Sequence, residues 1–307
     1  MSLSKITSAG FDSSATTDGI TLPIGSTAQR PASPVAGMTR FNTTLGYPEW
    51  YDAKTTSWSP FTNTSGTYTL TYLVVAGGGA GNSGWINDVS TNGGGGGAGG
   101  LLTGTLQVSN GQSFSSVIGA GSSYVGNNQN PQLSGSNSTL SGTTINTLTA
   151  LGGGGGGMQS RPGGAGGSGG GGAGGLGFST GGAGTTGQGN NGSSGVSGAN
   201  GTSGGGGGYG SAGGQPTAGS GYTDSVTGIT FAVGGAGCSS TGATGTSGSA
   251  NRGQGGGGSY NQNTAGNGGS GIVVLYYQGP QRAMGGTVTQ SGNYTIHTFT
   301  SSGTFIA

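Results

Sequence analysis

Side chains able to perform acid–base or nucleophilic chemistry are scarce in this chain. Its 307 residues include seven Lys and Arg, six Asp and Glu, one His and one Cys. The histidine, His297, falls in an alternating stretch, where we expect a surface or interface side chain rather than a general base. Asp88 and Asp224 could form a glycosidase-like carboxylate pair, but isolated acids are usually loop residues or turn caps. We therefore predict no catalytic residue and a protein that is not an enzyme.

Metal and phosphate sites are not predicted either. One His, one Cys and sparse acids cannot supply a usual ligand set, so we expect no metal and no cofactor. Matches to glycine motifs are expected by chance in a chain with 82 glycines, and no lysine follows Lys54. We expect Cys238 to be a small buried residue rather than a nucleophile.

Isolated aromatic side chains in loops of small residues are stronger candidates for function. Rigid aromatics surrounded by Gly, Ser and Asn are typical of antibody paratopes, where they supply contact area at low entropic cost. We predict that four of them lie in loops at one tip and contact a surface sugar or protein: Trp85, Tyr124, Tyr209 and Tyr260. The alternative is that some of these side chains close the ends of the glycine-rich scaffold.

Charge and hydrophobicity narrow the classes of partner. The formal net charge of +1 offers no electrostatic footprint for nucleic acid or an anionic membrane. The longest uninterrupted apolar stretch is 272–277, far shorter than the roughly 20 residues of a membrane helix. We expect no nucleic-acid partner and no membrane insertion. The first residues lack the apolar core of a secretory signal, so we expect synthesis in a cytoplasm.

Composition divides the chain into three regions. Residues 1–70 hold six glycines and eight of the charged residues, whereas residues 71–279 hold 72 glycines. Residues 280–307 return to alternating apolar and polar residues. We predict an N-terminal attachment module at 1–65, a glycine-rich domain at 66–279, and a C-terminal β-hairpin at 280–307. The hairpin is expected to pack on the sheet or on a neighbouring subunit.

The predicted fold class is all-β, essentially without α-helix. In the first module, Met38 to Phe41 and Pro48 to Asp52 are expected to form two short strands, with Trp50, Tyr51 and Trp58 available for a miniature core. A module of this size should be marginally stable alone, so we expect it to associate with sister copies or an anchoring protein.

In the glycine-rich region, β-prone stretches predict a sandwich-like sheet region. The predicted strands are 68–76, 101–108, 114–118, 143–151, 229–233 and 272–277. Leu73 to Val75 and Ile272 to Leu275 could pair as neighbours, which would bring the two ends of the region together.

The glycine runs themselves admit two structures. One is a flexible linker, because Gly/Ser tracts behave as random coils. The other is a bundle of polyglycine II helices, which are extended, have three residues per turn, and must pair their backbone groups sideways. Collagen needs abundant proline, yet residues 71–279 contain only Pro131, Pro162 and Pro216. Because linkers do not place β-branched and aromatic stretches at intervals, we favour a packed polyglycine II bundle.

Three stretches of the chain resemble bacteriophage fibre proteins. Gly25-Ser-Thr-Ala-Gln-Arg-Pro31 through Met38-Thr-Arg-Phe-Asn42 resembles a short module that recurs in tail-fibre and virion proteins. Tyr72-Leu-Val-Val-Ala-Gly-Gly-Gly79 and Gly269-Ser-Gly-Ile-Val-Val274 resemble the glycine-rich domain of many phage fibres. His297-Thr-Phe-Thr-Ser-Ser-Gly-Thr-Phe305 resembles a stretch that commonly precedes that domain, although here it follows it.

The resemblance to T-even-like distal tail-fibre adhesins implies a function. Such a protein would be a non-enzymatic adhesin of the virion whose loops bind a host cell-surface glycan or outer-membrane protein. The first module would attach to other tail proteins, and a homotrimer is the implied assembly. Two alternatives stay open: an ice-binding or cell-wall structural glycine-rich protein, and a glycan-cleaving tailspike.

Overall fold

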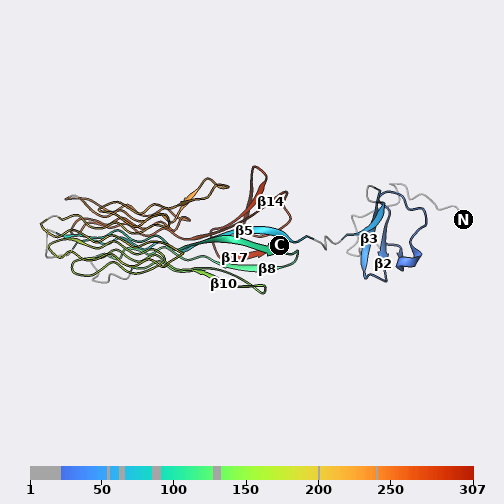
Figure 1. Ribbon diagram of the computed structural model, residues 1–307, viewed down its shortest axis with the longest axis horizontal. Helices are drawn as coiled ribbons and strands as arrows, with labels where there is room; N and C mark the ends of the chain where they lie inside the picture. The colour runs from blue at the N-terminus through green and yellow to red at the C-terminus, as the bar shows by residue number, and fades with distance from the viewer. Residues whose placement is uncertain are drawn as a thin grey trace, which may run out of the picture. The chain divides into compact units, whose positions relative to one another are not determined.

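The protein is all-β and divides into two compact units. The computed structural model describes residues 22–53, 56–61, 66–84, 91–126, 133–199, 201–239 and 241–307. The units are Met1–Gly66 and Thr67–Ala307, and each is described by itself (Figure 1). The one helical element in the described part is a three-residue 3-10 turn, Thr27–Gln29. The predicted absence of α-helix is therefore confirmed for these residues.

The first unit contains one four-stranded sheet. Its strands are β1 (Ile24–Gly25), β2 (Thr39–Asn42), β3 (Tyr47–Asp52) and β4 (Ser57–Pro60), arranged in that order. β1 pairs with β2 in parallel, and the other pairs are antiparallel. The two strands predicted in this unit match β2 and β3 to within one residue.

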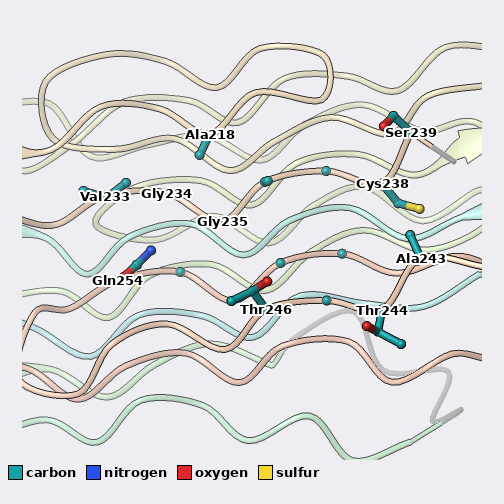
Figure 2. Close-up of a pocket in the computed structure, with 16 residues that line it drawn as sticks. Ala218, Val233, Gly234, Gly235, Cys238, Ser239, Ala243, Thr244, Thr246 and Gln254 are labelled. Carbon is teal, nitrogen blue, oxygen red and sulfur yellow. The ribbon is translucent and has the colours of Figure 1, made fainter.

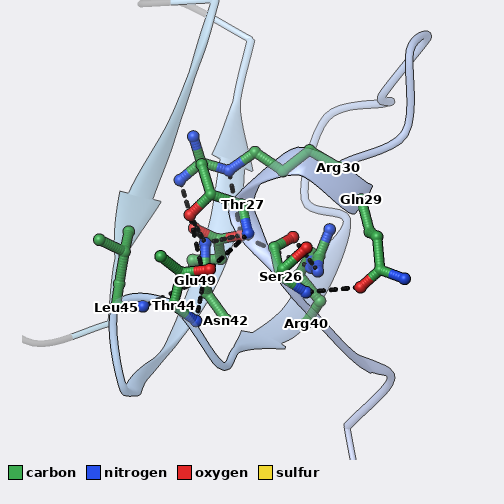
Figure 3. A network of polar contacts seen from close by, with 9 residues as sticks. All are labelled: Ser26, Thr27, Gln29, Arg30, Arg40, Asn42, Thr44, Leu45 and Glu49. Atoms are coloured by element: carbon green, nitrogen blue, oxygen red, sulfur yellow. Dashed lines mark hydrogen bonds and ion pairs between the residues drawn. The ribbon is translucent and has the colours of Figure 1, made fainter.

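The buried centre of the first unit is polar rather than aromatic. Among the described residues of this unit, the buried ones are Arg40, Asn42 and Glu49 (Figure 3). Arg30 donates two hydrogen bonds to the Glu49 carboxylate, at 3.2 and 2.6 Å, and the amide of Asn42 contributes two more at 3.1 Å. The hydrogen bonds from Arg30 are the main reason why the pKa of Glu49 lies below its usual value.

The predicted aromatic core of this unit is wrong. Tyr51 and Trp58 contact each other at 5.7 Å between ring centroids, but both remain half-buried. The guanidinium groups of Arg30 and Arg40 lie about 6 Å from the Trp58 ring, so the aromatic side chain serves partly as a surface for cations. A short sheet has little apolar area to bury, and paired charges fill its centre instead.

The second unit begins with two packed sheets. The first has the order β15-β16-β14-β5-β7, with β5 at Tyr68–Val75, β7 at Leu101–Val108, β14 at Ile272–Gln278, β15 at Thr287–Ser291 and β16 at Tyr294–Phe299. The second has the order β10-β9-β8-β17, with β8 at Ser113–Val117, β9 at Ser138–Gly142, β10 at Ile145–Ala150 and β17 at Gly303–Ile306. The predicted pairing of the two ends of the glycine-rich region is confirmed, because Val75 faces Ile272 across β5 and β14.

The hydrophobic core lies on both faces of the five-stranded sheet. On one face, Leu70 and Leu275 pack against Phe114, Leu140 and Phe305 of the second sheet. On the other face, residues such as Leu73, Val274 and Ile296 pack with Phe231 of a small hairpin formed by β12 (Tyr222–Thr223) and β13 (Thr230–Phe231). The predicted sandwich-like sheet region is therefore present.

The C-terminal residues join both sheets. β15 and β16 form a hairpin that pairs with β14, and β17 crosses to the second sheet, where it pairs with β8. The predicted C-terminal hairpin of the last two strands is wrong, because β16 and β17 lie in different sheets, and β16 pairs instead with β15, which was not predicted. β9, which separates β8 from β10 in the second sheet, was not predicted either.

The expected surface position of His297 is wrong, because the side chain is fully buried. β16 is covered on both faces, so Ile296 and His297 are buried on opposite sides. The Nδ1 atom of His297 lies 2.8 Å from the carbonyl oxygen of Gly285, which can only accept, so Nδ1 carries the proton. The Tyr277 hydroxyl, 3.3 Å from Nε2, then donates to the ring and accepts from the backbone amides of Arg282 and Ala283.

The glycine runs form an ordered lattice of extended segments that lead away from the sheets (Figure 1). Segment 93–100 illustrates the hydrogen-bond pattern, because its successive amides donate in turn to three different neighbouring segments. Gly94 and Gly97 donate to the carbonyl groups of Gly157 and Gly154. Gly95 and Ala98 donate to those of Gly204 and Gly207, and Gly96 and Gly99 donate to those of Gly256 and Gly253. This three-residue period is that of polyglycine II, and it confirms the predicted bundle over the linker.

Carbonyl groups of the same segment accept hydrogen bonds from three further neighbouring segments. They accept from Ala76, Gly79 and Asn82, from Ser168 and Gly171, and from Gly235. Segment 93–100 therefore lies inside a ring of six segments. Glycine is required at this spacing: a Cβ atom on Gly96 would lie 2.2 Å from the carbonyl oxygen of Gly79, and one on Gly97 2.2 Å from that of Ser168.

Candidate recognition surface

Turns between the extended segments gather at the end of the bundle that lies away from the sheets (Figure 1). There, β6 (Thr91–Asn92) pairs with β11 (Gly174–Gly175), and Asn92 forms a further bridge with Tyr260. Gly175 also bridges to Ser197. These short pairings fix the turns after residues 175, 196 and 260 against one another, so that they form one surface, which we call the tip.

The structure places two of the four predicted binding residues at the tip. The hydroxyl group of Tyr124 lies 3.0 Å from Oγ of Ser83, and its backbone amide donates to the side chain of Asn267 at 2.7 Å. Tyr260 pairs with Asn92 through the bridge described above. Both rings are half-buried. Trp85 lies outside the described residues.

Tyr209 does not lie with the other two. It ends the segment that runs back toward the sheets, and its ring makes an edge-to-face contact with Tyr222 at 5.6 Å. It packs against the cluster that includes Leu73 and Ile272. A glycine run gives no sign of its direction, so the sequence could not tell which turns lie at the tip and which lie beside the sheets.

The most exposed apolar side chains of the tip are aliphatic residues and one phenylalanine. Leu176 is 65% exposed, Phe178 52%, Val125 51% and Val196 41%. None of these four residues was among the predicted binding residues. The sequence carries a signal for Leu176 and Val196, since each is a large apolar residue with Gly or Ser on both sides.

The tip is nearly uncharged. In the described turns of the tip, Arg161 is the one residue with a formal charge. No group of three or more His, Cys, Asp or Glu residues that could hold a metal ion occurs in the described part of the chain. The surface therefore offers apolar area, hydroxyl groups and amides, which suit recognition by shape and hydrogen bonding.

Asp224 lies far from the tip, beside the five-stranded sheet. Its carboxylate is fully buried and accepts hydrogen bonds from the Tyr276 hydroxyl at 3.0 Å and from the amide and hydroxyl of Thr227 at 2.8 Å. These contacts cap the turn of the β12–β13 hairpin. Burial, followed by the contact with Asp224, raises the pKa of the Tyr276 hydroxyl, which remains protonated. Asp88, the other acid of the considered pair, lies outside the described residues.

The sheets and the glycine lattice place this chain in the class of all-β proteins with hydrogen-bonded, glycine-rich extended segments. The family model of the glycine-rich domain matches residues 54–278, more than half of the chain. The chain therefore belongs to the glycine-rich domain family. No curated protein and no solved structure gives a significant match. In the described residues, no helix has the length and apolarity needed to cross a bilayer.

Proposed function

We propose that this protein is a phage tail-fibre tip protein, a non-enzymatic adhesin of the virion that binds a host cell-surface receptor through its tip. The observation that carries the proposal is the contrast between a backbone-bonded, glycine-packed scaffold and the exposed apolar side chains of Leu176, Phe178 and Val196 at its end. Isolated apolar residues on rigid turns supply contact area without a large loss of conformational entropy.

The first unit suits attachment to other tail proteins. Ile24, Pro31, Met38 and Trp58 line a pocket of about 280 Å³ on its surface. Ile24 is 66% exposed, and Val35 and Phe61 are exposed as well. A small unit with exposed apolar groups and a polar centre gains stability when a partner covers it.

Assembly as a homotrimer is part of the proposal. Several tips on one virion would multiply a modest single-site affinity when their spacing lets them bind together. The mass of the purified protein in solution tests the assembly, and a protein that remains monomeric at all concentrations would refute the trimer.

Binding of the labelled protein to a panel of bacterial cells tests the adhesin function. We expect replacement of Leu176 and Phe178 by Ser to weaken binding to susceptible cells by roughly tenfold or more, as the loss of central contact residues does. Val117→Ser is the matched control, because Val117 is 47% exposed on β8, away from the tip. Equal binding by the tip variant and the control would contradict the proposal.

The chemical class of receptor is resolved by the same assay. Cells pretreated with a protease would lose binding if the receptor is an outer-membrane protein, and cells with a truncated surface glycan would lose binding if it is a sugar.

A further inference from the structure

A vacant position lies on the surface of the glycine lattice beside segment 254–259. Segment 254–259 bonds to five neighbours among the described residues, which are 76–84, 93–100, 232–239, 243–249 and 265–271. Consecutive members of this ring also bond to one another, except that no backbone hydrogen bond joins 232–239 to 243–249 in the described part of the chain. Since the inner segment 93–100 has six neighbours, the ring around 254–259 lacks its sixth.

A groove lies at that position. It has a volume of about 270 Å³, and its walls are formed by residues 233–239 and 243–246 (Figure 2). Its floor is lined by Gln254, Gly255, Gly257 and Gly258. Its walls are therefore the two segments between which the ring is open, and its floor is the segment with the missing neighbour.

Backbone carbonyl groups on the floor point into the groove. The amides of segment 254–259 donate to three of its neighbours: 232–239, 76–84 and 243–249. Its carbonyl groups accept from two others, since Gly256 accepts from Gly96 and Gly257 from Gly266. Around a threefold helix, the three directions in which amides donate alternate with the three in which carbonyl groups accept. The third direction for carbonyl groups therefore faces the vacant sixth position. The groups with this direction are those of Gly255 and Gly258, which are buried and accept no hydrogen bond from any described residue.

One wall of the groove supplies the complementary groups. Val233 and Ala236, also three residues apart, use their carbonyl groups to accept from Gly255 and Gly258. Their own amides donate to no described residue, although the amides of Gly234, Gly235 and Gly237 all donate within the lattice. The groove therefore offers two acceptors and two donors, each pair separated by one threefold turn of about 9 Å.

We propose that this groove binds one extended, glycine-rich segment of another polypeptide, which completes the lattice as the sixth neighbour of segment 254–259. The bound chain donates amides to Gly255 and Gly258 and accepts from Val233 and Ala236. Proline-rich chains of the same extended shape lack the amides. Chains with large side chains toward the floor meet backbone, as the lattice glycines show: a Cβ atom on Gly255 would already lie 2.1 Å from the carbonyl oxygen of Gly96.

A synthetic peptide provides the test. The probe is a capped peptide with the sequence of residues 264–271, Thr-Ala-Gly-Asn-Gly-Gly-Ser-Gly, which already forms an extended segment of this lattice. It is titrated into the full-length protein labelled with ¹⁵N. We expect saturable downfield shifts of the Val233 and Ala236 amides, slowed hydrogen exchange at both, and few changes elsewhere.

Two controls make the test specific. A peptide of the same sequence in which every backbone amide is N-methylated has the same length but lacks the donors, and should not bind. Ala236→Leu places a larger side chain at the exposed wall and should weaken peptide binding by roughly tenfold or more. Ala212→Leu, at another exposed alanine, should leave it unchanged.

Each contrary result overturns the proposal. These results are an absence of shifts at Val233 and Ala236 at millimolar peptide, equal binding of the N-methylated peptide, and equal binding by Ala236→Leu. Shifts at the same amides that grow with protein concentration in the absence of peptide would assign the groove to a second copy of the chain instead.

Discussion

At the scale of single residues, the notable feature is how few titratable side chains the folded chain contains and how completely some of them are buried. His297 and Asp224 are fully buried, and each is held by hydrogen bonds to a tyrosine hydroxyl and to nearby backbone or threonine groups. Such networks specify one arrangement of a core, because a partly satisfied network is costly. These residues stabilise the two sheets rather than expose reactive groups.

His297 should make stability depend on pH. Burial lowers its pKa below the ordinary value of 6.5, so the unfolded chain binds a proton more readily than the folded one. The contribution of the neutral ring is therefore complete above pH 6.5 and is lost as the pH falls through the folded pKa. We expect the urea midpoint of the second unit to decrease between pH 8 and pH 5.5.

The variant His297→Gln is the control for this prediction. His297 is the one histidine of the chain, so the variant has no imidazole that titrates in this range. Its midpoint should be nearly constant over the same interval. Parallel pH profiles for the variant and the natural chain would show that His297 is not responsible.

At the scale of elements, the strands were more accessible to sequence analysis than the turns. β5 and β14 are continuous runs of apolar, β-branched residues, and both their positions and their pairing follow from that pattern. β9 and β15 carry one large apolar residue each, Leu140 and Val288, so neither produces a recognisable run. The direction of each glycine segment leaves no trace in composition, which is why Tyr209 was grouped with the tip.

The tolerance of the extended segments to substitution should differ sharply between positions. Gly96→Ala places a methyl group 2.2 Å from the Gly79 carbonyl oxygen, inside a ring of six segments, and we expect a loss of about 2 kcal/mol or more in the free energy of unfolding. Gly214→Ala is the matched control, because its nearest neighbour would lie at 3.4 Å. Thermal unfolding of both variants measures the difference, and similar melting temperatures would argue against the close-packed lattice.

At the scale of the whole molecule, cohesion comes from two different sources in the two units. The first unit has a buried ion pair, Arg40 with Glu49, and polar contacts at its centre. The second combines an apolar core between sheets with a region in which backbone hydrogen bonds join distant segments. Composition alone indicated this division, since most charges precede residue 71 and most glycines follow it. Which polar groups would be buried together was not readable from the sequence.

Hydrogen exchange provides a test of the lattice as a whole. Amides of segment 93–100 donate to eight different acceptors and should exchange at rates close to those set by global unfolding, as core strands do. The amides of Val233 and Ala236, which have no described acceptor, should exchange much faster. Mass spectrometry of peptic fragments or NMR can measure both. Fast exchange throughout 93–100 would mean that the segments are not bonded in solution.

The threefold rotation of hydrogen bonds constrains how such a chain can change its length. An insertion of one residue within 93–100 would turn all later residues by a third of a revolution, so that each amide would face the wrong neighbour. Three residues added together would restore the facing, whereas the turns can absorb any number. Insertions and deletions within the extended segments should therefore occur in multiples of three residues, whereas the turns are free to vary in length.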